Sequence, residues 1–218
     1  MRFRDRHEAG RLLAERLSSF RGREDVIVLG VPRGGVVVGN EIARALEVSL
    51  DVYITRKIGV PYNPELAIGA VASDGQVVLD TNLIRRLGIS QGYVDEEVER
   101  QKAEIQRRLE EYRGQRPPPE LKGRTVILTD DGVATGATIR AAIQAIRAKN
   151  PAEIVLAIPV GPPETVAELR AEADEVICLY TPSLFWAVGA FYIDFSQTSD
   201  EQVKNLLEEL WKTSGEPK

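Results

Sequence analysis

One segment constrains the fold of this chain more than any other: an apolar run that ends in two adjacent acids and continues through small residues into a helical pattern. Residues 126–128 are apolar, Asp130 and Asp131 follow, and Gly132 opens a turn that leads to Thr138. A buried strand must end where charged groups appear, so we expect both acids at a carboxyl strand end, where open α/β sheets bind ligands. Glycines let the backbone approach a ligand closely, and N–H groups at a helix N-terminus bind phosphate. The segment predicts a phosphosugar site.

Apolar and helical segments alternate along the rest of the chain. Helical patterns at 33–47, 136–149 and 162–172 separate apolar segments near 25–31, 50–55, 125–130, 153–159 and 175–180. This alternation predicts an α/β fold in which a doubly wound, mainly parallel sheet carries helices on both faces. Right-handed crossovers would bring the strand ends, and any site built on them, to one edge. We expect a single domain over residues 1–218.

Composition narrows the function classes. The chain has 218 residues and a net charge of −5, which argues against nucleic acid as an obligatory partner. Apolar runs stay well short of the roughly 20 residues of a membrane span, and charge begins at Arg2, so we expect a cytoplasmic protein without a membrane partner. With one histidine, His7, and one cysteine, Cys178, the chain has little material for a catalytic triad or a Cys-rich metal site.

The acid-containing segment resembles the 5-phosphoribosyl 1-pyrophosphate (PRPP) motif of the type I phosphoribosyltransferases: a hydrophobic strand, two acids, two further residues, a small residue and Thr-Gly-x-Thr. The resemblance implies that Asp130 and Asp131, called the acid pair below, hold the ribose 2- and 3-hydroxyls. The other residues that it assigns to PRPP, called the Thr135 turn below, are Gly132, Val133, Ala134, Thr135, Gly136, Ala137 and Thr138, the last five around the 5-phosphate. An ordinary strand–turn–helix unit would explain neither the acid pair nor the Thr-Gly-Ala-Thr spacing.

A second glycine-rich turn follows the first apolar segment and carries a cation. It contains Arg33, Gly34 and Gly35, called the Arg33 turn below. In phosphoribosyltransferases the corresponding turn binds pyrophosphate, so the resemblance makes Arg33 a catalytic residue that stabilises charge on the leaving group. Taken alone, Pro-Arg-Gly-Gly could also be only a tight turn.

The segment from about 56 to 120 is expected to form a flexible lid and a long inserted helix. Arg56 and Lys57 resemble the start of the mobile loop in adenine phosphoribosyltransferases, which implies that they clamp pyrophosphate as catalytic residues; the alternative is a solvated basic strand end. An Asp-Gly turn predicts a hairpin of residues 67–72 with 76–79. The charged stretch 95–116 has a narrow apolar stripe, which predicts a helix that packs on the sheet domain or forms a homodimer.

Residues 181–196 are rich in aromatic side chains and are expected to form a small C-terminal hood over the acceptor. Their order resembles a stretch of 6-oxopurine phosphoribosyltransferases, which implies that Trp186 stacks on the acceptor base and that Asp194 lies on the metal side. The assignment of Asp194 requires one extra residue after Gly189, and a core role for Trp186 is the alternative.

The resemblance implies an enzyme that transfers the phosphoribosyl group of PRPP to a nitrogenous acceptor, releases pyrophosphate and uses Mg²⁺ held mainly by its substrate. A purine-like base, as in nucleotide salvage, is the leading acceptor. Ala134 stands where 6-oxopurine enzymes have an aspartate, so the acceptor and the proton-transfer residue stay open. The alternatives are a PRPP-sensing regulatory protein without transfer activity, and hydrolysis or synthesis of the phosphosugar.

Overall fold

The centre of the molecule is a parallel five-stranded sheet. The computed structural model describes residues 1–213, apart from the side chains of Pro64, Glu65 and Thr213. The strand order is β2-β1-β6-β7-β8, and every neighbouring pair is parallel. The strands are β1 (Val26–Gly30), β2 (Ser49–Val52), β6 (Thr125–Thr129), β7 (Glu153–Val160) and β8 (Glu175–Tyr180). The predicted doubly wound, mainly parallel sheet is confirmed.

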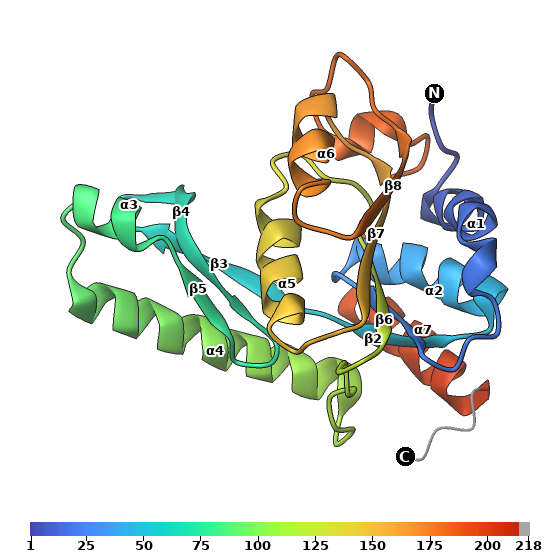
Figure 1. Ribbon diagram of the computed structural model, residues 1–218, viewed down its shortest axis with the longest axis horizontal. Coiled ribbons are helices and arrows are strands. Elements are labelled where there is room, and N and C mark those ends of the chain that lie inside the picture. Colours follow the sequence, from blue (N-terminus) through green and yellow to red (C-terminus); the bar gives the residue numbers. More distant parts are fainter. Residues whose placement is uncertain (214–218) are drawn as a thin grey trace.

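Helices cover both faces of this sheet (Figure 1). The helices on one face are α1 (Arg6–Arg16), α2 (Gly34–Leu46) and α7 (Asp200–Thr213), and those on the other are α5 (Ala137–Arg147) and α6 (Pro163–Leu169). Strand residues alternate between the two resulting cores: Val26 and Val28 pack with the first group, Ile27 and Leu29 with the second. Burial on both faces explains why the strands are continuous apolar runs rather than alternating ones.

Residues 55–113, which lie between β2 and β6 in the sequence, form an arm that projects from one side of the sheet (Figure 1). It consists of β3 (Thr55–Val60), β4 (Asn63–Ala72), β5 (Val77–Leu79), α3 (Thr81–Arg86) and α4 (Gln91–Arg113). The predicted hairpin is present, since residues 69–71 of β4 pair antiparallel with β5. The sequence analysis missed β3, which pairs antiparallel with β4 and makes the arm a three-stranded sheet.

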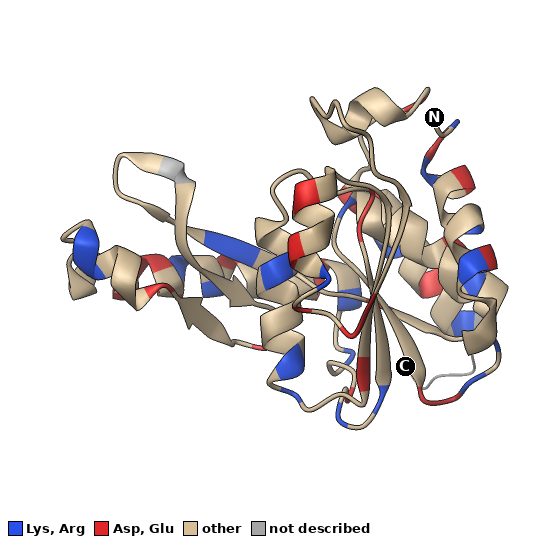
Figure 2. Ribbon diagram, turned by 45° about the horizontal axis from the view of Figure 1, so that its top comes forward, with Lys and Arg blue, Asp and Glu red and all other residues tan. Residues whose placement is uncertain are grey.

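The long helix α4 packs its apolar stripe inward. Val94, Ile105 and Tyr112 are among its buried residues, and the helix contacts β3, β4 and α7. Acidic and basic residues alternate along its outer side (Figure 2), where Glu104 pairs with Arg107 and Arg108. Most of these exposed pairs add little to stability, so the stripe and not the charge fixes the position of the helix.

The hood, residues 181–196, contains one short helix, η2 (Val188–Phe191), and is held together by aromatic rings; the only other 3-10 helix in the described part of the chain is η1 (Ser18–Phe20). The rings of Phe185 and Phe191 stack 5.2 Å apart. Phe3 forms an isolated parallel bridge with Tyr192, which joins the hood to the segment before α1. Within residues 1–213, the helices are too short or too polar to cross a bilayer.

Candidate functional site

The acid pair lies at the carboxyl end of β6, the central strand of the sheet. Asp130 and Asp131 follow Thr129 directly, and the Asp131 N–H donates to a carboxylate oxygen of Asp130 over 2.8 Å. Burial raises the pKa of both carboxyl groups, and the negative charge of Asp131 adds to the rise for Asp130. Two adjacent, partly buried carboxylates with raised pKa values are a costly arrangement that is typical of functional sites.

The Arg33 turn lies directly against the acid pair, because β1 and β6 are neighbours in the sheet. A Cβ atom at Gly35 would lie 2.8 Å from both the Asp130 Cα and the Thr129 carbonyl oxygen, and a Cβ atom at Gly34 would collide with the Asp131 carboxylate. Glycine is therefore required at both positions, because a larger residue would not fit between the Arg33 turn and the acid pair. The Arg33 turn and the acid pair, which the sequence analysis linked only by motif, are therefore in direct contact.

The Thr135 turn leads from the acid pair into α5. Gly136 is the N-cap residue with φ 72°, a left-handed conformation that favours glycine, and no side chain caps the helix. Ala134, Thr135 and Thr138 are exposed, so the start of α5, where N–H groups have no partner within the helix, lies at the protein surface. The Thr165 hydroxyl at the start of α6 donates to the Ala134 carbonyl over 2.9 Å and holds the turn.

Arg33 is the N-cap residue of α2, and its peptide bond with Pro32 is cis. Its guanidinium lies 3.6 Å from the carboxylate of Asp200, the first residue of α7. The side chains of Arg33 and Asp200 are 33% and 39% exposed, so this cation remains accessible.

The sequence analysis missed two residues that hold Asp131. The Nε atom of Arg6 lies 2.7 Å from an Asp131 carboxylate oxygen, and the Tyr192 hydroxyl donates to the Asp131 carbonyl over 2.6 Å. Both partners are far from Asp131 in sequence. They reach it because the start of α1 and the hood both lie at the carboxyl end of β6. The sequence around Arg6 forms the start of α1, where the Asp5 side chain accepts a hydrogen bond from the Glu8 N–H, and it contains no signal that points to the acid pair.

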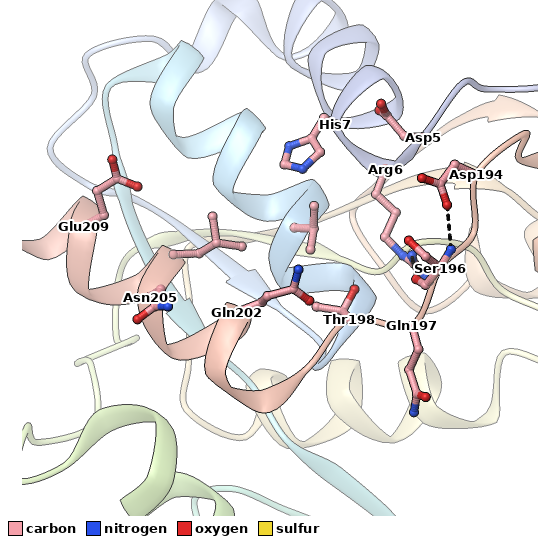
Figure 3. A pocket seen from close by; sticks show the side chains of 12 residues that line it. Asp5, Arg6, His7, Asp194, Ser196, Gln197, Thr198, Gln202, Asn205 and Glu209 are labelled. Carbon is pink, nitrogen blue, oxygen red and sulfur yellow. Dashed lines mark hydrogen bonds between the residues drawn. The ribbon is translucent and has the colours of Figure 1, made fainter.

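A pocket of about 350 Å³ opens on the other side of Arg6, between α1, α7 and the end of the hood (Figure 3). Asp194 lines this pocket, and its carboxylate accepts a hydrogen bond from the Ser196 N–H over 2.9 Å. That bond lowers the pKa of Asp194. The Asp194 side chain thus bonds within the hood and lines the pocket, and its assignment to the metal side stays a prediction.

The structure shows where the remaining predicted residues lie. The Arg56 guanidinium on β3 donates to the Gln101 side chain of α4 over 2.7 Å, and Lys57 next to it is exposed. The Trp186 side chain is 86% exposed at the hood, so its alternative role as a core residue is wrong. Among the described residues, no group of three or more His, Cys, Asp or Glu side chains could form a metal cage.

Comparisons with known proteins give one consistent result. Residues 6–196 match a family model described as the phosphoribosyl transferase domain. The crystal structure of TT1426 from Thermus thermophilus is 48% identical, with a TM-score of 0.85, and the match covers 96% of this chain and 99% of that one.

Curated relatives from Mycobacterium tuberculosis strains CDC 1551 / Oshkosh and ATCC 25618 / H37Rv are provisionally named phosphoribosyl transferases. Each is 47% identical over 206 residues, which is 94% of this chain and 46% of the relative. The chain therefore spans less than half the length of these relatives.

Proposed function

This chain belongs to the phosphoribosyl transferase family, and from that premise we propose that it transfers the phosphoribosyl group of PRPP to a nitrogenous acceptor. The acceptor nitrogen forms a bond to the anomeric carbon while the bond from that carbon to pyrophosphate breaks, the electron pair leaves with pyrophosphate, and the acceptor nitrogen releases its proton to solvent. The observation that carries the proposal is the direct contact between the Arg33 turn and the acid pair. A ligand with a vicinal diol between two anionic groups fits such a surface.

Each part of PRPP has a complementary group in this arrangement. The carboxylates of Asp130 and Asp131 would accept hydrogen bonds from the two ribose hydroxyls. The N–H groups at the start of α5 would bind the 5-phosphate, which also gains from the helix dipole. These interactions orient the sugar, and orientation supplies a large part of such a rate enhancement.

The leaving pyrophosphate would bind at the Arg33 turn. The N–H groups of Gly34 and Gly35 and the charge of Arg33 stabilise the negative charge that develops as the bond breaks. Mg²⁺ bound with PRPP would neutralise part of the same charge. The ion would be held mainly by the substrate, with Asp194 as the predicted acid on the metal side.

The arm would act as a lid. A ribosyl centre with cationic character is easily attacked by water, so closure favours transfer to the acceptor. The Arg56 side chain on β3 is hydrogen-bonded to Gln101 of α4, so this hydrogen bond would have to break before Arg56 could reach pyrophosphate. Arg56 and Lys57 are proposed as the residues that make this contact.

A purine-like base is the proposed acceptor, with the exposed ring of Trp186 available for stacking. Such a reaction belongs to nucleotide salvage. A homodimer and a cytoplasmic location stay predictions, and the apolar stripe of α4 is not available for a dimer because it packs within the chain.

The test is pyrophosphate release from PRPP and Mg²⁺ with a panel of purines, pyrimidines and simple amines, together with calorimetry of PRPP binding. Turnover with one acceptor supports the proposal, and the double variant Asp130→Asn, Asp131→Asn should lose PRPP binding. Asp25→Asn is the control, because this exposed acid pairs with Arg23 at the opposite end of β1. Binding without turnover of any acceptor would favour the PRPP-sensing regulator. Absence of binding would overturn both.

A further inference from the structure

We infer that Arg6 is a positioning residue for the proposed reaction, one that fixes the Asp131 carboxylate in the orientation and charge state in which it accepts the ribose hydroxyl. This inference rests on the proposed function. Arg6 lies outside both sequence motifs, and its role follows from contacts between three parts of the chain that are distant in sequence.

The ion pair between Arg6 and Asp131 is short and shielded. The Nε atom lies 2.7 Å from the carboxylate oxygen, and the two side chains are only 11% and 16% exposed. Most ion pairs on protein surfaces contribute little because water and salt screen them, but screening is much weaker at this degree of burial. The pair therefore affects both the orientation and the charge of Asp131.

Arg6 is itself held on two further sides. One terminal nitrogen of its guanidinium donates to the Ser196 carbonyl over 2.8 Å, and the guanidinium carbon lies 3.9 Å from the centre of the Phe195 ring. Figure 3 shows Arg6 beside Ser196 at the wall of the pocket. A side chain fixed by a carbonyl and a ring keeps one geometry, which is what a positioning group requires.

The Arg33 turn leaves room for this contact. A Cβ atom at Gly34 would lie 2.7 Å from the Arg6 Nε atom, in addition to its collision with Asp131. The glycine thus permits the guanidinium, the carboxylate and the α2 N-terminus to meet at one point.

The charges around Asp131 explain why a cation is needed there. Burial raises the pKa of Asp131, and Arg6 is the main group that opposes this rise. A hydrogen bond from the Asp130 side chain opposes the rise less than Arg6 does, Tyr192 of the hood offers only a hydroxyl, and Arg33 on α2 is turned toward Asp200. Asp5, the N-cap residue of α1, adds a further negative charge near Tyr192. Without Arg6, the carboxyl would stay protonated to higher pH and would accept the hydroxyl less well.

The test compares Arg6→Met, Arg6→Lys and the control Arg11→Met. Arg11 is on the same helix and pairs with Glu41, 3.6 Å away. The first readout needs no activity: the Asp131 carboxyl is titrated by carbon NMR, with its signal assigned from Asp131→Asn. The second is the affinity for PRPP with Mg²⁺ at several pH values.

In Arg6→Met, we expect the Asp131 titration to move to higher pH and the PRPP affinity near neutral pH to fall roughly ten- to a hundredfold, as for the loss of a charged hydrogen bond. The deficit should shrink as pH rises, because the carboxyl then ionises without help. Arg6→Lys should restore part of both properties, and Arg11→Met should match the wild type.

An unchanged Asp131 titration in a folded Arg6→Met protein would overturn the inference, and so would an affinity loss of equal size at every pH, which a merely structural role predicts. If the titration moves but the wild type binds no PRPP, the proposed function has failed, and the ribose part of the inference fails with it.

Discussion

The carboxylate of Asp200 lies between Arg33 and Tyr112: one oxygen is 3.6 Å from the Arg33 guanidinium, and the other accepts a hydrogen bond from the Tyr112 hydroxyl. Tyr112 is fully buried near the C-terminal end of α4, so Asp200 joins the arm to the Arg33 turn. Since the Arg33 pair is partly exposed and long, it is weak enough to be exchanged for an anionic ligand.

Replacement of Arg33 by Ala should weaken inhibition by pyrophosphate roughly ten- to a hundredfold, because the leaving group loses a charged partner. Inhibition by ribose 5-phosphate should change little. Both inhibition constants are measured against PRPP, with Arg44→Ala as the control on the same helix, where it pairs with Glu209. Equal shifts of the two constants would refute the assignment of pyrophosphate to the Arg33 turn.

Gly35→Ala should destabilise the protein by about 1–3 kcal/mol, because the new Cβ atom would press on the backbone of Thr129 and Asp130, which cannot move aside easily. Gly92→Ala is the matched control: nothing lies within 4 Å of its Cβ position near the start of α4, and alanine favours helix by up to about 1 kcal/mol. Urea unfolding measures both. If Gly35→Ala did not change the free energy of unfolding, the Arg33 turn would be packed less tightly against Thr129 and Asp130 than described.

Asp130→Asn should raise the free energy of unfolding by about 1 kcal/mol near pH 8 while it abolishes function. The pKa of Asp130 is raised in the folded protein, so the folded state binds more protons than the unfolded chain between the ordinary and the raised pKa. Wild-type stability therefore falls as pH rises through that window, whereas asparagine does not titrate. Thermal unfolding is measured from about pH 4, near the ordinary pKa of a carboxyl group, to about pH 8. The stability of the variant relative to the wild type should grow as pH rises. A constant difference would contradict the raised pKa.

Thr165→Val removes the hydroxyl that holds the Ala134 carbonyl. The affinities for PRPP and ribose 5-phosphate should fall about fivefold, the value of one neutral hydrogen bond, while that for pyrophosphate stays unchanged. Calorimetry with the three ligands measures this, and Thr165→Ser should retain the wild-type values. A loss confined to pyrophosphate would place the phosphate subsites the other way round.

Trp186→Ala should leave stability unchanged, because the ring is 86% exposed. If the ring stacks on the acceptor, the KM for the acceptor should rise roughly two- to tenfold and the KM for PRPP should not. Steady-state kinetics with the acceptor found in the panel decides. An unchanged acceptor KM would remove Trp186 from the acceptor site.

The sequence predicted the parts of the structure that depend on local patterns. Buried strands appear in the sequence as apolar runs. Because the acid pair directly follows such a run, its position at the carboxyl end of a buried strand could be predicted. Arg6 and Tyr192 could not be predicted in the same way, because their contacts with Asp131 depend on how α1 and the hood cross the sheet.

The strand β3 was missed for a different reason. Arg56 and Lys57 interrupt its apolar pattern, and its partner β4 is what makes it a strand. The predicted roles of Arg56, Lys57, Trp186 and Asp194 depend on a ligand and remain predictions.

The adjacency of β1 and β6 also has an evolutionary consequence. The spacing between the Arg33 turn and the acid pair is set by backbone hydrogen bonds of a central sheet, in register from Val26 opposite Thr125 to Gly30 opposite Thr129, and no side-chain substitution can readily alter it. The arm and the hood lie outside this constraint. Divergence among relatives in what they accept should therefore accumulate in those appended segments, while the proposed binding of the phosphorylated sugar would be inherited with the sheet itself.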